Sequence, residues 1–242
     1  MDLQEKKKEL LNKYNTNTSF DLEDAVDMIR VLRGKDGCPW DAEQTHGSIR
    51  NNLVEEAYEV LHAIETNDIP SLYDELGDVL MQVIFHALIG EDEGEFDLND
   101  VCTAMCEKMI RRHPHVFADV QADTSSKVLQ NWESIKKKEK GLRSGTESVL
   151  DVPVTLPALT RAYKIQQKAA GVGFDWDDPQ CVIDKVAEEL SETREAYEEY
   201  TAAFGADSDV QCDDKKDGKD MLKEHLREEI GDLMFSAVNL SL

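Results

Sequence analysis

Apolar residues recur at intervals of three and four positions along most of the chain, which is the spacing of one face of an α-helix. No segment shows a convincing alternation of apolar and polar residues of the kind that predicts a half-buried strand. The pattern therefore predicts an all-α protein. The expected helices run from about Leu22 to Arg33, Ser48 to Thr66, Ile69 to Ile89, Leu98 to Arg112, Ser125 to Lys140, Leu156 to Ala170, Pro179 to Phe204 and Lys219 to the end.

Two of the expected helices carry a start signal. Asp97 and Thr124 stand directly before their helices, with acidic or polar residues in the first turn, as N-cap residues do. The segment GKDGCPWD, residues 34–41, has too few suitably spaced glycines for a phosphate-binding loop, and no Gly-Lys-Ser/Thr occurs. We interpret it as a turn that carries Trp40 into the core, with Asp41 as an N-cap.

The chain repeats a set of short motifs on either side of a segment rich in Gly, Ser and Pro. CPWD, EEAYE and ELGD occur in the first half, and FDWDD, EELSE and EEIGD in the second. We therefore expect two similar domains, at residues 1–140 and 157–242, joined by a linker at 141–156. The acid motifs are 19 positions apart in the first copy and 40 in the second, so an insertion near residues 201–220 is expected to form a mobile loop.

Composition narrows the possible partners and the cellular compartment. Fifty-one acidic residues against 27 basic ones give a formal charge of -24, and such a field repels nucleic acid. The chain has no run of 18 or more apolar residues, and its N-terminus lacks the apolar stretch of a signal peptide. Five cysteines without a C-x-x-C pair fit a reducing compartment. We expect a cytoplasmic protein that binds neither nucleic acid nor a membrane.

Two pairs of acids stand at the same spacing of three residues, Glu56 with Glu59 and Glu75 with Asp78. On a helical wheel the first pair falls opposite the apolar residues Tyr58 and Leu61. Taken alone, this pattern indicates an amphipathic helix with a solvated acidic face. Like charges one turn apart repel each other, so the regular spacing requires another explanation if the acids are not solvated.

The helix after this one is apolar on almost every side. Its polar positions, Glu75, Asp78, Gln82 and His86, form one narrow stripe, which we expect to face the interior or a cleft. If the two helices pack antiparallel, four carboxylates converge on one small volume. Oxygen ligands of this kind suit Mg²⁺ or Mn²⁺. The second copy repeats both pairs, as Glu189, Glu192, Glu229 and Asp232.

A di-iron helical bundle is the main alternative for these carboxylates. Such bundles use Glu-x-x-His pairs, and Glu59 with His62 fits that pattern. The partner helix, however, carries Glu-x-x-Asp, and the second copy has Thr193 and Ala196 where nitrogen ligands would be needed. The carboxylate pattern therefore favours Mg²⁺ or Mn²⁺.

Two further pairs share a helix face because their members are four residues apart, Lys108 with Arg112 and Trp132 with Lys136. If these faces close over the acidic site, they supply cations for phosphate groups and an aromatic plane for a base. The alternative is that Trp132 anchors the core and the basic residues are solvated. Spacing alone leaves both interpretations open.

The motifs taken in order resemble one known family. GCPWDAEQT, LVEEAYEVLHAI, LYDELGDVLMQVIFHA, KMIRRHPHVFAD, NWESIKKKEK and, later, LPALTRAYKIQQKAAGVGFDW are similar to the MazG family of nucleoside triphosphate pyrophosphohydrolases, over essentially the whole chain. The resemblance implies an all-α homodimer that uses Mg²⁺ to hydrolyse nucleoside triphosphates to monophosphate and pyrophosphate.

Site residues follow from this resemblance by position. The implied metal ligands are Glu56, Glu59, Glu75 and Asp78 in the first copy, and Glu189, Glu192, Glu229 and Asp232 in the second. The implied phosphate and nucleoside contacts are Lys108, Arg112, Trp132 and Lys136. Glu55, adjacent to a ligand, is our candidate for orienting or deprotonating the attacking water.

The second copy departs from the family pattern. In two-repeat relatives the C-terminal copy usually carries the activity, with a basic helix and a Trp-containing helix after its second acid pair. Here the sequence stops at VNLSL, shortly after Asp232, and no equivalent helices follow. We therefore expect the first copy to be the working site. The alternative is a non-catalytic module that binds nucleotide and metal for regulation or dimerisation.

Overall fold

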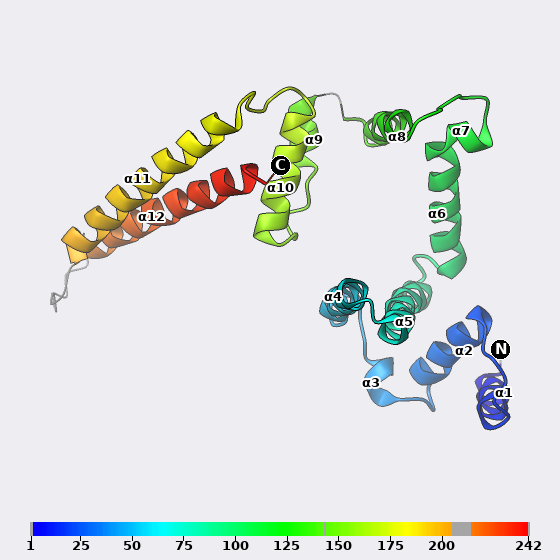
Figure 1. Ribbon diagram of the computed structural model, residues 1–242. Coiled ribbons are helices and arrows are strands. Elements are labelled where there is room, and N and C mark those ends of the chain that lie inside the picture. The colour runs from blue at the N-terminus through cyan, green and yellow to red at the C-terminus, as the bar shows by residue number, and fades with distance from the viewer. Residues whose placement is uncertain (1, 143, 205–213, 242) are drawn as a thin grey trace. The chain divides into compact units, whose positions relative to one another are not determined.

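The computed structural model describes residues 2–142, 144–204 and 214–241, and it divides the chain into two compact units, Met1–Ala122 and Asp123–Leu242. Within the described residues every regular element is an α-helix, which confirms the predicted all-α class (Figure 1). The helices of the first unit are α1 (Leu3–Asn15), α2 (Leu22–Arg33), α3 (Pro39–Ala42), α4 (Arg50–Thr66), α5 (Ile69–Glu93), α6 (Leu98–Arg112) and α7 (Pro114–Phe117). Those of the second unit are α8 (Ser125–Glu139), α9 (Gly145–Leu150), α10 (Ala158–Ala170), α11 (Pro179–Phe204) and α12 (Asp214–Asn239).

Side-chain caps explain where several helices begin. The side chain of Asp97 caps α6 by accepting a hydrogen bond from the backbone N–H of Asp100 at 2.9 Å. The side chain of Asp100 in turn accepts a bond from the backbone N–H of Asp97. Thr124 caps α8 by accepting a bond from the N–H of Lys127. Both predicted N-caps are therefore confirmed.

Helices α4 and α5 form an antiparallel hairpin and lie side by side (Figure 1). Asn67 ends α4 in the left-handed conformation, with φ of 54°, which an asparagine tolerates. Asp68 then caps α5 by accepting a bond from the N–H of Ser71, and Pro70 stands in the first turn, where its missing N–H costs nothing. A turn of two residues therefore brings the facing surfaces of α4 and α5 together.

The core of the first unit lies between α2, the start of α4 and the C-terminal half of α5. Its buried members are Val26, Ile29, Ile49, Ile84, Phe85, Leu88 and Ile89. Two ion pairs join α2 to α5 at one end of this core. Arg30 lies 2.7 Å from the carboxylate of Glu91, and Arg33 lies 2.7 Å from that of Asp92. The C-terminal half of α5 is therefore buried in this core, and the acids lie in the half of the helix that precedes it.

We expect Ile84→Ala to lower the free energy of unfolding by about 2–5 kcal/mol, because Ile84 is only 1 % exposed and the substitution leaves a cavity. Met105→Ala on α6, where the side chain is 52 % exposed, is expected to change it by about 0.5 kcal/mol or less. Urea unfolding followed by circular dichroism measures both changes. Equal effects of the two substitutions would contradict this placement of the core.

Some features of the first unit were predicted wrongly or not at all. Helix α1 was not predicted, because its pattern is polar; it docks through Lys6, whose Nζ lies 2.9 Å from the carboxylate of the buried Asp27. Trp40 does not enter the core, since it is 59 % exposed. It lies in α3, which begins at Pro39, so Asp41 stands inside that helix and is no N-cap.

In the second unit α11 and α12 lie side by side, and α10 packs against α12 (Figure 1). Helix α9 forms within the segment that we interpreted as a linker. The division between Ala122 and Asp123 places α8 in the second unit, whereas the sequence interpretation assigned it to the first domain. The domain boundaries and the repeat therefore stay predictions.

The expected insertion near residues 201–220 is helical at both ends, since α11 continues to Phe204 and α12 begins at Asp214. Residues 205–213, where we expected a mobile loop, lie outside the described residues. Among the helices that the structure describes, none has the length and apolar character needed to span a membrane.

Candidate functional site

The hairpin of α4 and α5 brings the first set of predicted carboxylates together. One carboxylate oxygen from each of Glu56, Glu75 and Asp78 lies within 4.8 Å of the other two, and all three side chains are half-buried. Glu59, one turn after Glu56 on α4, lies close enough to Glu75 to raise the pKa of that carboxyl. We call these four residues the first acidic cluster.

Burial and mutual repulsion dominate the electrostatics of the first acidic cluster. Burial raises the pKa of Glu56, and the nearby charges of Asp78 and Glu59 raise it further. Burial likewise raises the pKa of Glu75, and so does the hydrogen bond that its protonated carboxyl donates to Glu59. Every cause acts against the charged form, so the cluster is a place where bound positive charge is favourable. Half-buried carboxylate oxygens this close together suit Mg²⁺ or Mn²⁺.

The orientation of α4 decides between the two interpretations of its acids. Glu56 lies half-buried toward α5, while Glu55 and Glu59 are exposed, so the acidic face is only partly solvated. The apolar residues opposite, Tyr58 and Leu61, are 54 % and 50 % exposed. Glu56 therefore lies against the neighbouring helix, whereas Tyr58 and Leu61 stay largely exposed.

The polar stripe of α5 turns inward, as predicted. Gln82 is only 4 % exposed. The Nδ1 atom of His86 lies 2.7 Å from Nδ1 of His46, and the two rings are stacked. Burial and the neighbouring His46 lower the pKa of His86. The stripe therefore continues from the first acidic cluster into the core.

A second acidic cluster lies between α11 and α12. Oxygens of Glu189, Glu192 and Glu229 approach one another within 4.8 Å, and Asp232 follows one turn later on α12. The hydroxyl of Thr193 holds the two helices in register, because it is 2.8 Å from the carbonyl oxygen of Glu189 and 3.2 Å from that of Glu229. Burial, with the charge of Glu189, raises the pKa of Glu192.

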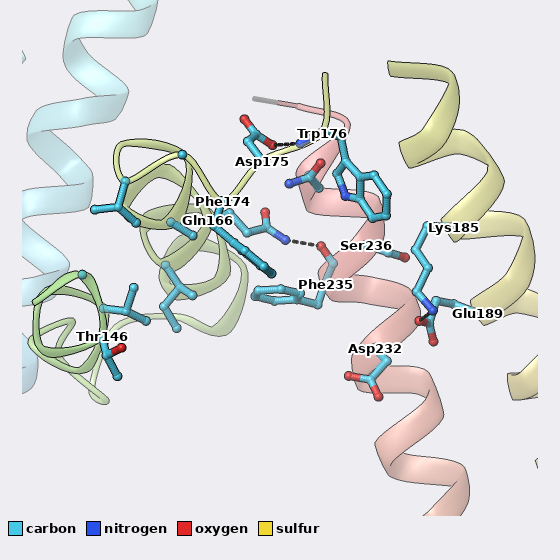
Figure 2. Close-up of a pocket in the computed structure, with 17 residues that line it drawn as sticks. Thr146, Gln166, Phe174, Asp175, Trp176, Lys185, Glu189, Asp232, Phe235 and Ser236 are labelled. Atoms are coloured by element: carbon cyan, nitrogen blue, oxygen red, sulfur yellow. Dashed lines mark hydrogen bonds and ion pairs between the residues drawn. The ribbon is translucent and has the colours of Figure 1, made fainter. Parts of the chain in front are cut away.

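A pocket of about 940 Å³ opens beside the second acidic cluster (Figure 2). One wall is polar and charged, with Lys185, Glu189 and Asp232. The other walls are mainly apolar, and they include Phe174 and Trp176 from the chain between α10 and α11. The pocket also contains Gln166, Phe235, Ser236 and residues of α9.

The predicted phosphate and nucleoside contacts fall in different units. Lys108 and Arg112 are half-buried and share a face of α6 in the unit that holds the first acidic cluster. Trp132 and Lys136 are half-buried on α8 in the second unit. Each pair stands on one helix face, as predicted, and their joint action on one ligand stays a prediction.

Sequence reasoning missed two residues beside the second acidic cluster. Lys185 pairs with Glu189 at 2.7 Å, and a spacing of four residues on one helix was a sufficient signal for it. Gln166 is 6 % exposed and donates a hydrogen bond from Nε2 to the carbonyl oxygen of Phe235 at 2.6 Å. No sequence signal links Gln166 to α12, because the two positions are 69 residues apart.

Comparison with known proteins places these features in a family. The model of the MazG nucleotide pyrophosphohydrolase domain matches residues 44–117, which include the first acidic cluster. The chain is 45% identical over 214 residues to the nucleoside triphosphate pyrophosphohydrolase of Escherichia coli K12, covering 88% of this chain and 74% of that protein. It is 41% identical over 219 residues to the nucleoside triphosphate pyrophosphohydrolase/pyrophosphatase MazG of Thermotoga maritima, covering 90% and 74%. A third relative, from Mycolicibacterium smegmatis, is 39% identical over 155 residues, covering 63% and 47%.

Proposed function

Because this chain belongs to the MazG nucleotide pyrophosphohydrolase family, we propose that it hydrolyses nucleoside triphosphates to nucleoside monophosphates and pyrophosphate, using Mg²⁺ held by the first acidic cluster. The approach of Glu56, Glu75 and Asp78 within 4.8 Å is the observation that carries the proposal. The match of the family model to residues 44–117 supports the choice of this cluster.

The donor set fits a hard divalent cation. The first acidic cluster offers carboxylate oxygens alone. Mg²⁺ and Mn²⁺ prefer such ligands, whereas zinc is usually bound by nitrogen or sulfur atoms. A cation also offsets the repulsion that raises the pKa of Glu56. When bound at such a site, Mg²⁺ or Mn²⁺ neutralises phosphate oxygens and lowers the pKa of a nearby water.

The protein's own side chains carry the rest of the proposed reaction. Glu55 is exposed next to Glu56 and accepts a proton from the attacking water. The water oxygen bonds to the α-phosphorus, the bond from that phosphorus to the bridging oxygen breaks, and pyrophosphate leaves. Lys108, Arg112 and Lys136 bind the outer phosphates, and Trp132 stacks on the base.

Product analysis tests the proposed reaction. The purified chain is incubated with each nucleoside triphosphate and Mg²⁺, and the products are separated by ion-exchange chromatography. The proposal requires equimolar nucleoside monophosphate and pyrophosphate. Nucleoside diphosphate with phosphate would overturn the assigned bond cleavage. Intact triphosphate that nevertheless binds would favour the alternative of a non-catalytic module.

We further propose that two copies of the chain associate through the exposed apolar side of α4 and α5. Val54, Tyr58, Leu61 and Ile64 lie on one side of α4, and each is between 50 % and 54 % exposed. Ile69, Tyr73 and Leu76 of α5 add to this exposed apolar area. Large apolar side chains exposed in this number on two paired helices are typical of a protein interface, and the resemblance to homodimeric relatives favours a second copy as its occupant.

Leu61→Asp is expected to convert the proposed dimer to a monomer, because it places a charge in the centre of the apolar area. Leu150→Asp, on α9, where the side chain is 77 % exposed, is the matched control and is expected to leave the mass unchanged. Sedimentation equilibrium of the three proteins measures the mass. A monomeric wild type would reject the proposal.

A further inference from the structure

Two histidines of the first unit are bound to each other. Nδ1 of His46, in the chain before α4, lies 2.7 Å from Nδ1 of His86 on α5. The two rings are stacked, with centroids 5.0 Å apart and planes 8° apart, and the ring of Phe96 stacks on His46 at 6.0 Å. We call His46 and His86 the histidine pair. The stacked rings and the short hydrogen bond hold the chain before α4 against α5.

The number of protons decides whether this contact forms. A hydrogen bond between two Nδ1 atoms needs one atom that carries a proton and one that does not. A neutral pair meets this condition, and so does a pair with one added proton, because the added proton occupies an Nε2 atom. When both rings are charged, both Nδ1 atoms carry protons and neither accepts. The hydrogen bond is then lost, and two positive charges repel each other.

The charged groups around the histidine pair favour a charge on one ring only. From the end of α5, the carboxylate of Glu93 lies 3.9 Å from Nε2 of His46. The chain after α5 contributes an uncharged phenyl ring. From α2, Arg33 adds positive charge to this region, and its guanidinium is paired with Asp92. Burial, and after it the charge of His46, lowers the pKa of His86. A second charge therefore meets more opposition than the first.

We propose that the histidine pair is an acid-sensitive contact, which holds the start of α4 on α5 while at most one ring is charged and opens when both rings are charged. A histidine titrates between about pH 5 and 8, so the contact opens within a few pH units of neutrality. Hydrogen bonds of the backbone carry no charge and do not respond in this way.

The place of the histidine pair in the hairpin determines what its opening changes. The turn at Asn67 and Asp68 closes one end of the hairpin of α4 and α5 (Figure 1). The histidine pair closes the other end, since His46 stands three residues before Ile49, the N-cap residue of α4. After the pair opens, the burial of Ile49, which is 3 % exposed, still holds the start of α4. We therefore expect the start of α4 to loosen, and not the whole unit to unfold.

Opening of the histidine pair also affects the first acidic cluster. Glu56 on α4 and Asp78 on α5 lie between the closed turn and the histidine pair. Their oxygens approach each other because the two helices lie side by side. Separation of the helices weakens cation binding, in addition to the direct competition by protons. This consequence rests on the proposed metal binding by the cluster, whereas the opening of the pair does not.

The effect of the histidine pair on stability has a definite sign. The pKa of His86 is lowered from the ordinary value of 6.5, so the folded chain binds this proton more weakly than the unfolded chain does. The pair's contribution to stability is complete above pH 6.5 and is lost as the pH falls below that value. The raised pKa values of Glu56 and Glu75 act in the opposite direction, so a comparison of variants is needed to separate the two effects.

Nitrogen NMR of the full, metal-free chain with ¹⁵N-labelled histidine tests the proton count. Long-range proton–nitrogen spectra distinguish an Nδ1 atom that carries a proton from one that does not. At neutral pH the proposal requires one protonated and one bare Nδ1 within the pair, with signals assigned by His46→Gln and His86→Gln. Two bare Nδ1 atoms would overturn it, because no proton would then join the rings.

Hydrogen exchange measured by mass spectrometry tests the opening. Protection factors of residues 50–57 in the wild type are expected to fall about tenfold between about pH 7.5 and pH 5, because a pKa difference of one unit changes an equilibrium tenfold. His86→Gln keeps a hydrogen-bonding side chain that does not titrate, so its protection should stay within about twofold over that range. His62→Gln makes the same change at an exposed position of α4, and it should lose protection as the wild type does.

The remaining outcomes also decide the question. Constant protection in the wild type, or an equal fall in His86→Gln, overturns the proposal. Circular dichroism verifies folding, and His46→Gln replaces any His86→Gln protein that does not fold. If the pair opens as expected and the chain hydrolyses no triphosphate, the acid-sensitive contact stands and the proposed function fails. If hydrolysis continues and the pair does not open, the proposed function stands alone.

Discussion

Asp78→Asn is expected to reduce the rate of nucleoside triphosphate hydrolysis by at least about a hundredfold, because the substitution removes the charge of a proposed metal ligand in the first acidic cluster. Asparagine keeps the size of the side chain, so packing around α5 is preserved. The rate of pyrophosphate release from wild type and variant measures the effect.

Two controls separate this result from general damage. Asp74→Asn makes the same chemical change at an exposed position of α5, and it should leave the rate within about twofold of wild type. Asp78→Asn should also raise the melting temperature of the metal-free protein, because it relieves the repulsion that raises the pKa of Glu56. If Asp232→Asn abolished hydrolysis and Asp78→Asn did not, the working site would be the second acidic cluster.

Removal of divalent cations is expected to abolish hydrolysis almost completely, by about a thousandfold or more, because the carboxylates alone repel the phosphate groups. Dialysis against a chelator followed by a stopped assay measures the residual rate. Mg²⁺ should restore activity, and Mn²⁺ should substitute for it because both ions accept oxygen ligands. Activity that persists at wild-type level in excess chelator would refute the proposed role of the metal.

The carboxylates of the first acidic cluster are expected to make both the stability of the metal-free fold and the binding of the cation depend on pH. Folding raises the pKa of Glu56 and Glu75 above the ordinary value of 4.5, so the folded, metal-free chain binds their protons more tightly than the unfolded chain does. The metal-free fold therefore loses stability as the pH rises through those raised pKa values. Cation binding shows the opposite trend, since protons compete with the metal. The apparent affinity for Mg²⁺ should fall on acidification at a pH above that expected for isolated glutamates, which calorimetric titrations measure directly.

Local signals in the sequence predicted much of the helical layout. The ends of α2, α6 and α11 agree with the predicted spans, because capping residues and hydrophobic periodicity act over a few positions. Helix α1 escaped prediction because its pattern is polar, and its ion pairs with α2, of Lys6 with Asp27 and of Lys13 with Asp24, leave no local signal in the sequence. The prediction that Trp40 enters the core was wrong, because a short motif does not reveal whether its side chains pack against another helix.

The carboxylate arrangement was predictable for a physical reason. Two acids three residues apart on each of two helices converge when a short turn makes the helices antiparallel, and Asn67 and Asp68 provide that turn. The helical wheel did not reveal that Tyr58 and Leu61 would stay exposed in a single chain, because it gives the faces of a helix and not their neighbours. The pocket of the second unit was unpredictable, since it joins α9, α10, α11 and α12.

Anomalous diffraction from crystals grown with Mn²⁺ shows whether the first acidic cluster holds the metal. We expect a manganese peak bounded by the carboxylates of Glu56, Glu75 and Asp78. A structure in which that position holds no manganese, while the second acidic cluster does, would contradict it.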